Sequence, residues 1–225
     1  MAQAPTAPPP THEQRLRMSY PEWLTWADGS TQSEWVDGEV IVFMPPTVLH
    51  ARIVGFLAGV LGWYVEAFGL GEVLQAPVEM RLPGRRSSRE PDLLFVAQEH
   101  RARIGEQRIE GAADLVVELI SDDSEERDRR AKVAKYAAVG VPEYWIVDPR
   151  PGQHRSDFSR LAPDGTYEAI PPDAEGRVHS VVLPGFWLRP AWLSRDPLPD
   201  PFACLLEIAP DLLVDAARGR PAPDA

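Results

Sequence analysis

Two acidic residues lie in or beside short apolar runs, where an unpaired carboxylate is costly. Asp92 opens the run DLLFV directly after Pro91, and Glu118 lies inside the run DLVVELI, 26 residues later. A carboxylate moved out of water needs a counter-charge or hydrogen-bond donors. If the two runs are neighbouring strands, both carboxylates can bind one Mg²⁺ ion, which prefers hard oxygen ligands. The backbone carbonyl of Leu119 can add a further oxygen.

A lysine follows on the next predicted helix. Asp128, Lys132 and Tyr136 are spaced four residues apart, so they share one helix face. Packing of this helix back over the sheet would bring that face to the carboxylates. A lysine there can orient or deprotonate a metal-bound water and stabilise a pentavalent phosphate. The alternative is a surface helix with an Asp–Lys pair and a half-buried tyrosine.

Hydrophobic spacing, caps and turns predict the elements that position these residues. A short helix is expected over 19–28 with Ser19 as its N-cap. The segment SEWVDGEVIVFMP predicts a strand pair that turns at Asp37-Gly38, and a long helix begins at Thr47. The later elements are strands over 71–82, 92–96, about 111–120 and 143–149, a polar loop over 83–90, and the clearest helix over 122–140.

The order of these elements predicts a mixed sheet flanked by helices, an α/β or α+β fold, with a β-rich C-terminal part. Residues 1–17, rich in Pro and Ala, predict a disordered lead-in. Residues 18–197 predict one domain, and residues 198–225 predict a short helix followed by a disordered tail.

Composition narrows the function classes. The apolar fraction of 44% and charged fraction of 25% are typical of a globular protein. No secretory signal or membrane span is expected, and the single Cys204 excludes an internal disulfide, so a cytoplasmic location is predicted. The net charge of −11 argues against non-specific DNA adhesion, yet 12 of the 23 Lys and Arg residues lie between residues 81 and 135. A local basic groove therefore stays open.

The combination EPDLLFV, DLVVELIS and DRRAKVAKYAAVGVPEYWIVDP resembles the restriction endonuclease family of the PD-(D/E)XK nuclease superfamily. The upstream stretch SEWVDGEVIVFMPPTVLHARIV fits the same pattern, so the resemblance covers roughly residues 20–195. It implies a mixed central sheet flanked by helices and Mg²⁺-dependent cleavage of a DNA phosphodiester bond, with Mn²⁺ as a substitute ion.

Position by position, the resemblance implies that Asp92 and Glu118 bind the metal. The usual lysine two residues after the second acid is absent, because Ile120 stands there, and Lys132 on the following helix replaces it. Tyr136 is expected to orient Lys132 or contact the DNA backbone. The expected supporting residues are Glu39, His50, Glu79 and Asp128, and the expected phosphate contacts are Arg81, Arg89 and Arg129.

Some alternatives stay open on the sequence. His50 could equally be a structural histidine at the start of a helix, and Glu39 could be a solvated hairpin residue. A second function hypothesis is a nuclease fold kept as a binding module without turnover, which the acidic net charge favours. A glycoside hydrolase fits less well, because its two acids flank an open cleft rather than a basic helix face. Cutting of both strands would favour a homodimer.

Overall fold

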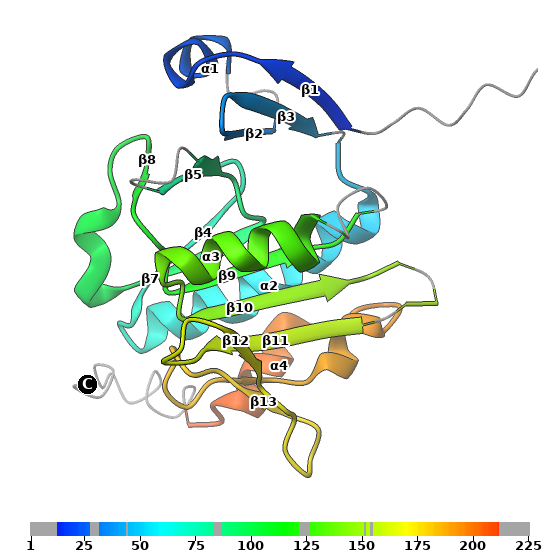
Figure 1. Cartoon of the computed structure of the whole chain (residues 1–225). Coiled ribbons are helices and arrows are strands. Elements are labelled where there is room, and N and C mark those ends of the chain that lie inside the picture. The colour runs from blue at the N-terminus through cyan, green and yellow to red at the C-terminus, as the bar shows by residue number, and fades with distance from the viewer. Residues whose placement is uncertain are drawn as a thin grey trace, which may run out of the picture.

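The computed structural model describes residues 13–27, 32–43, 45–82, 87–121, 127–150, 152–153 and 155–211. Two six-stranded sheets, a two-stranded sheet and a set of helices form the described part of the chain (Figure 1). Sheet A has the order β1-β3-β2-β6-β5-β8, and sheet B has the order β12-β11-β10-β9-β7-β4. The mixed α/β fold expected from the sequence is confirmed.

Sheet A is built mostly from the N-terminal third of the chain. Its strands are β1 (Glu13–Arg17), β2 (Ser33–Val36), β3 (Glu39–Phe43), β5 (Glu79–Leu82), β6 (Ser87–Arg89) and β8 (Arg108–Glu110). The β2–β3 hairpin turns where predicted, because Asp37 and Gly38 both adopt positive φ, 52° and 92°. Helix α1 (Tyr20–Trp26) packs on this sheet, and Ser19 and Glu22 form a capping box at its start.

Sheet B carries the main core. Its strands are β4 (Gly71–Gln75), β7 (Leu93–Ala97), β9 (Leu115–Leu119), β10 (Glu143–Asp148), β11 (Arg155–Leu161) and β12 (Tyr167–Ala169). Only β9 and β10 pair in parallel, while every other neighbouring pair is antiparallel. Alternate residues face opposite sides, so Val117 and Leu119 join one core cluster while Val116 and Ile120 join the other. Glu118 therefore faces the Val116 side.

Helices cover both faces of sheet B (Figure 1). Helix α2 (Val48–Ala67) and helix α4 (Pro201–Ile208) pack on one face, and α3 (Val133–Val139) lies on the other. A π-helical turn, η2 (Arg127–Lys132), leads into α3, which ends at Gly140 with φ 79°. The remaining short elements are η1 (Gln98–Arg103), η3 (Pro190–Ser194), β13 (Val178–His179) and β14 (Trp187–Leu188).

Helix α2 is long and apolar enough to cross a membrane by length and composition. Its buried residues, however, belong to the core that faces sheet B, among them Leu57, Val60 and Tyr64. The same core takes in Leu205 and Ile208 of α4, so the helix predicted beyond residue 197 packs with the domain. Alternation of buried and exposed positions along α2 is typical of a core helix.

The structure corrects three predicted elements. Residues 13–17 are strand β1, paired with β3, rather than the end of a disordered lead-in. The single strand expected over 71–82 is two strands in different sheets, separated at the cis Ala76-Pro77 bond. The polar stretch 87–89, expected to be loop, is the buried strand β6, because β2 and β5 flank it on both sides.

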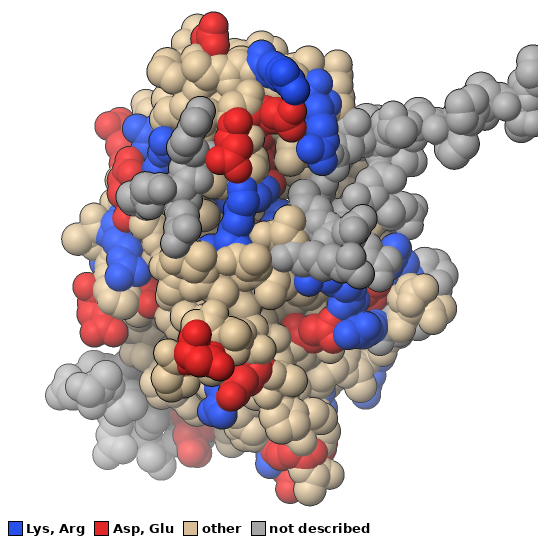
Figure 2. All heavy atoms as spheres, viewed as in Figure 1, with Lys and Arg blue, Asp and Glu red and all other residues tan. Residues whose placement is uncertain are grey.

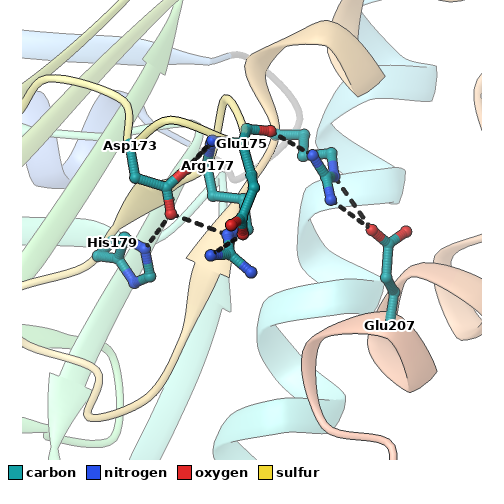
Figure 3. A network of polar contacts seen from close by, with 6 residues as sticks. Asp173, Glu175, Arg177, His179 and Glu207 are labelled. Carbon is teal, nitrogen blue, oxygen red and sulfur yellow. Dashed lines mark hydrogen bonds and ion pairs between the residues drawn. The ribbon is translucent and has the colours of Figure 1, made fainter.

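A polar network fixes the β-rich C-terminal part (Figure 3). The side chain of Asp173 accepts hydrogen bonds from Arg177 Nε and His179 Nε2, each at 2.8 Å. These contacts lower the pKa of Asp173, first through His179 and then through the Arg177 backbone. Arg189 reaches Glu207 of α4 at 2.9 Å and so ties the β14 region to that helix.

Candidate active site

Asp92 and Glu118 lie on adjacent strands, as the spacing predicted. β7 and β9 pair antiparallel with Leu93 opposite Val117, so Asp92 stands at the end of β7 beside Glu118. The backbone N–H of Leu119 donates a 2.7 Å hydrogen bond to Asp92 Oδ2. Both carboxylates are buried, with exposed fractions of 8% and 3%. Two carboxylates thus meet in a site from which most water is excluded.

The buried charge of Glu118 is compensated by the helix that follows its strand. Lys132 Nζ lies 2.8 Å from Glu118 Oε1, and the Tyr136 hydroxyl donates to the same oxygen at 2.7 Å. Burial, and then the charge of Glu118, raise the pKa of Tyr136 well above its ordinary value, so its hydroxyl stays a proton donor. Because Lys132 and Tyr136 are four residues apart, both side chains reach the same carboxylate oxygen of Glu118.

A third carboxylate reaches the same lysine. Glu34 of β2 is fully buried, and its Oε1 lies 3.1 Å from Lys132 Nζ. Its other oxygen accepts a hydrogen bond from Arg89 Nη1 of β6, which is also buried. Burial lowers the pKa of Arg89, but the charge and hydrogen bond of Glu34, together with Tyr136 and Glu118, outweigh burial and leave the pKa raised. Sheet A therefore contributes an ion pair to a site whose other carboxylates belong to sheet B.

Glu34 is not among the site residues predicted from the sequence, although one signal was present. Glu34 stands beside Trp35 and Val36 in a short strand, as Glu118 stands among Val117 and Leu119. A glutamate inside an apolar strand is the same signal in both places. Applied to β2, it would have predicted a buried, paired carboxylate.

His50 contacts Asp92, as expected for a residue near the site. Thr47 caps α2 by accepting from the His50 backbone N–H at 3.2 Å, which places the histidine in the first helical turn. The His50 Nε2 atom lies 3.0 Å from Asp92 Oδ1. Both carboxylate oxygens of Asp92 thus have a partner, His50 on one and the Leu119 backbone on the other.

The donor set of this cluster fits a divalent cation. Three carboxylates, on Glu34, Asp92 and Glu118, face two permanent cations, Arg89 and Lys132, so negative charge is in excess when His50 is neutral. Magnesium is commonly held by one or two carboxylates together with water and phosphate oxygens. Within the described ranges, no group of three His, Cys, Asp or Glu residues could form an all-protein cage. The Asp92 and Glu118 carboxylates thus fit a divalent cation whose remaining ligands are water or phosphate oxygens.

Two of the expected supporting acids lie in other contacts. Glu39 pairs with Arg15 at 3.4 Å on the exposed side of sheet A. Glu79, the other expected supporting residue, accepts hydrogen bonds from Tyr20 at 2.6 Å and from Ser88. Its strand β5 pairs with β6 and β8 and not with β7, the strand that follows Asp92. The side chain of Asp128 lies outside the described part of the structure.

Of the three expected phosphate contacts, Arg89 is corrected, while Arg81 and Arg129 stay predictions. Arg89 is 2% exposed and pairs with Glu34, so its guanidinium is not available to DNA. Arg81 lies over the Tyr20 ring, 3.7 Å from its centroid. Arg129 lies in an acidic setting, 3.6 Å from Asp148 and paired with Asp157. The predicted role of Arg81 and Arg129 at the DNA backbone has no support in these contacts.

Glu90, next to β6, should titrate near neutral pH. Burial, together with the charges of Glu34 and Glu79, raises its pKa to about 7, although the Ser33 backbone N–H opposes this. A raised pKa means that the folded protein holds the proton more tightly, so this stabilisation is lost as pH rises from about 4.5 to about 7. Urea unfolding should show wild type losing about 1 to 2 kcal/mol over this window relative to Glu90→Gln. Parallel pH profiles of the two proteins would contradict the assignment.

Comparisons with known proteins place the chain in a family. The family model for Uma2, described as "Putative restriction endonuclease", matches residues 19–191. A search of curated proteins found no match.

A solved structure with a similar fold is described as a "putative nuclease belonging to DUF820" from Anabaena variabilis ATCC 29413. It is 19% identical, with a TM-score of 0.58, over 72% of this chain and 89% of the other. At this identity the likeness concerns the fold, whereas the family match spans Asp92, Glu118 and Lys132. The chain therefore belongs to the Uma2 family of restriction-endonuclease-like proteins.

Proposed function

We propose that this protein is a divalent-metal-dependent DNA endonuclease. The observation that carries the proposal is the convergence of Lys132 and Tyr136 on Glu118, beside the Asp92 carboxylate. Two adjacent carboxylates can hold a metal ion that activates water for phosphodiester hydrolysis, and a lysine beside them can stabilise the developing charge. The family match supports the nuclease class, while the metal, the DNA substrate and the mechanism belong to the proposal.

Each side chain has a role in this proposal. Asp92 and Glu118 would hold Mg²⁺ or Mn²⁺, with the Leu119 carbonyl as a further oxygen. The ion would activate water and neutralise charge on the phosphate. Lys132 orients the attacking water and stabilises the negative charge that develops on the phosphate. Tyr136 holds Glu118 in place by its hydrogen bond, and His50 does the same for Asp92.

The competing proposal is a binding module that does not cleave DNA. For either function we propose a cytoplasmic location. On the face shown in Figure 2, Lys and Arg side chains are interleaved with Asp and Glu rather than gathered in one stripe. With a net charge of −11, this distribution of charge favours contact with a few DNA phosphates over non-specific binding along a duplex.

If the protein acts as the proposed endonuclease, a homodimer would bring one site to each of the two DNA strands.

A nuclease assay separates the two proposals. Purified protein is incubated with plasmid and linear DNA in Mg²⁺, Mn²⁺ or EDTA, and wild type is compared with Glu118→Ala and Lys132→Ala. We expect metal-dependent nicking that falls by at least about 100-fold in both variants. Nicking that survives in Glu118→Ala would overturn the site. If wild type does not cleave, thermal stabilisation by Mn²⁺ would show whether the carboxylates bind metal, and its absence would favour the binding module.

A further inference from the structure

We propose that Glu34 is a positioning residue for Lys132, held in place by Arg89. This inference deepens the proposed function and rests on it for its catalytic consequence. Its structural content, however, is that Lys132 stays buried at the site only while the Glu34 carboxylate is charged and reaches it, and that statement is testable without metal or DNA.

The first observation is that the Lys132 ammonium lies between two carboxylates from different sheets. It is 2.8 Å from Glu118 Oε1 and 3.1 Å from Glu34 Oε1, and its side chain is 4% exposed. Burying an ammonium group is costly unless it is paired with good geometry. Two anchors from two directions fix the position of the nitrogen, whereas a single pair would let the flexible lysine stem swing.

The second observation is that Glu34 is itself fixed. Trp35 pairs with Ser88 in the β2–β6 ladder, which places Glu34 next to Arg89 on one face of sheet A. Arg89 Nη1 binds Glu34 Oε2, so Oε1 is the atom that faces Lys132. The arginine is buried and keeps its charge, as its raised pKa indicates. A fixed cation thus holds Glu34 ionised and correctly oriented.

The third observation is that one oxygen of Glu118 has several partners. Its Oε1 already serves Lys132 and Tyr136, and the proposed function adds a metal ion to the same carboxylate. Glu34 gives Lys132 an anchor that is independent of Glu118. Lys132 can therefore remain beside the reacting phosphate even when the Glu118 carboxylate also binds the metal ion. Removal of a residue that orients an active-site side chain without binding the metal itself typically changes activity by about 10- to 100-fold.

The first test measures the accessibility of Lys132 in the metal-free protein. Lysines are acylated with an N-hydroxysuccinimide ester, and each site is followed by mass spectrometry in wild type and Glu34→Gln. We expect Lys132 to be acylated several times faster in Glu34→Gln. Lys135, which is more exposed and pairs with Asp37, should keep its rate. Unchanged protection of Lys132 would overturn the proposal.

Two controls separate positioning from loss of fold. Cys204 is buried in the core far along the chain, so its thiol should stay unreactive in a folded variant. Glu72→Gln removes another strand carboxylate paired with an arginine, Arg101 at 2.6 Å, and should leave Lys132 protected. If Glu34→Gln exposes Cys204, Glu34→Asp is used instead. Glu34→Asp keeps the carboxylate but shortens its reach to Lys132. We then expect an intermediate rate of Lys132 acylation, and protection as strong as in wild type would contradict the proposal.

The second test asks what the residue does in turnover. We expect Glu34→Gln to lower kcat about 10- to 100-fold while KM for DNA and the affinity for Mn²⁺, measured by electron paramagnetic resonance, stay unchanged. A fall in Mn²⁺ affinity would make Glu34 a metal ligand and overturn the positioning role. If wild type itself does not cleave DNA, the proposed function fails, and the acylation result still decides the role of Glu34.

Discussion

Lys132→Met is expected to lower the free energy of unfolding by about 3 to 5 kcal/mol and to abolish DNA cleavage. The substitution keeps most of the volume but removes the cation that two buried carboxylates share, on Glu34 and Glu118. Arg89 and Tyr136 still contact these groups, yet neither replaces the lost charge between them. Urea unfolding at pH 7 measures the stability, and the plasmid assay measures the activity.

The pH dependence distinguishes this mechanism from simple loss of packing. Protonation of either carboxylate relieves the repulsion, so the loss in Lys132→Met should be smaller at pH 5 than at pH 8. Adding Glu118→Gln should recover part of the stability, since the amide oxygen still accepts from Tyr136. Lys135→Met, whose partner Asp37 is exposed, should cost less than about 1 kcal/mol. A similarly small loss in Lys132→Met would contradict the buried network.

Glu143→Leu is the second change with a large expected effect, about 3 to 5 kcal/mol of stability. The Glu143 carboxylate is fully buried at the start of β10. It accepts hydrogen bonds from Trp145 Nε1 and Ser180 Oγ, each at 2.7 Å, and from two backbone N–H groups, Val181 at 2.8 Å and Val182 at 3.1 Å. Leucine removes the acceptor shared by these four donors, and the Trp145 indole N–H then lies buried without it.

A titration checks this role of Glu143. Burial raises the pKa of its carboxyl, although the hydrogen bonds from Ser180, Trp145 and the loop backbone oppose the shift. A raised pKa gives stability that is complete below about pH 4.5 and is lost as pH rises through the folded-state pKa. The stability advantage of wild type over Glu143→Gln should therefore shrink between pH 4 and pH 8. Ser180→Ala removes only one donor and should lower the free energy of unfolding by about 1 kcal/mol. An equally small loss in Glu143→Leu would contradict the role of Glu143 as the shared acceptor.

The central part of the site was predictable because it depends on local spacing. Strand alternation places Glu118 on one face of β9, and the i, i+4 rule places Lys132 and Tyr136 on one helix face. The chain order of two neighbouring strands and the next helix then brings them to Asp92. Ser19, Asp37-Gly38 and Gly140 likewise have conformational preferences that act within a few residues.

The other half of the site could not be predicted in this way. Glu34 and Arg89 are 55 residues apart, and their pairing depends on the contact of β2 with β6. The sequence SSR has no apolar residue, so its burial is a consequence of its neighbours and not of its own composition. Residues 71–82 were predicted as one strand for the same reason: β5 follows β4 in the chain but pairs with β6 and β8, whereas β4 pairs with β7.

The small core of the N-terminal layer has a consequence for how the protein opens. Only Trp23, Trp35 and Val40 are fully buried in the cluster of α1, β2 and β3, whereas the two clusters around sheet B are far larger. Amide hydrogens of β2 and β3 should therefore exchange by a local opening of lower free energy than global unfolding. Because that opening would withdraw Glu34 from Lys132, we expect the stability of this small cluster to limit the fraction of molecules in which Lys132 is held between Glu34 and Glu118.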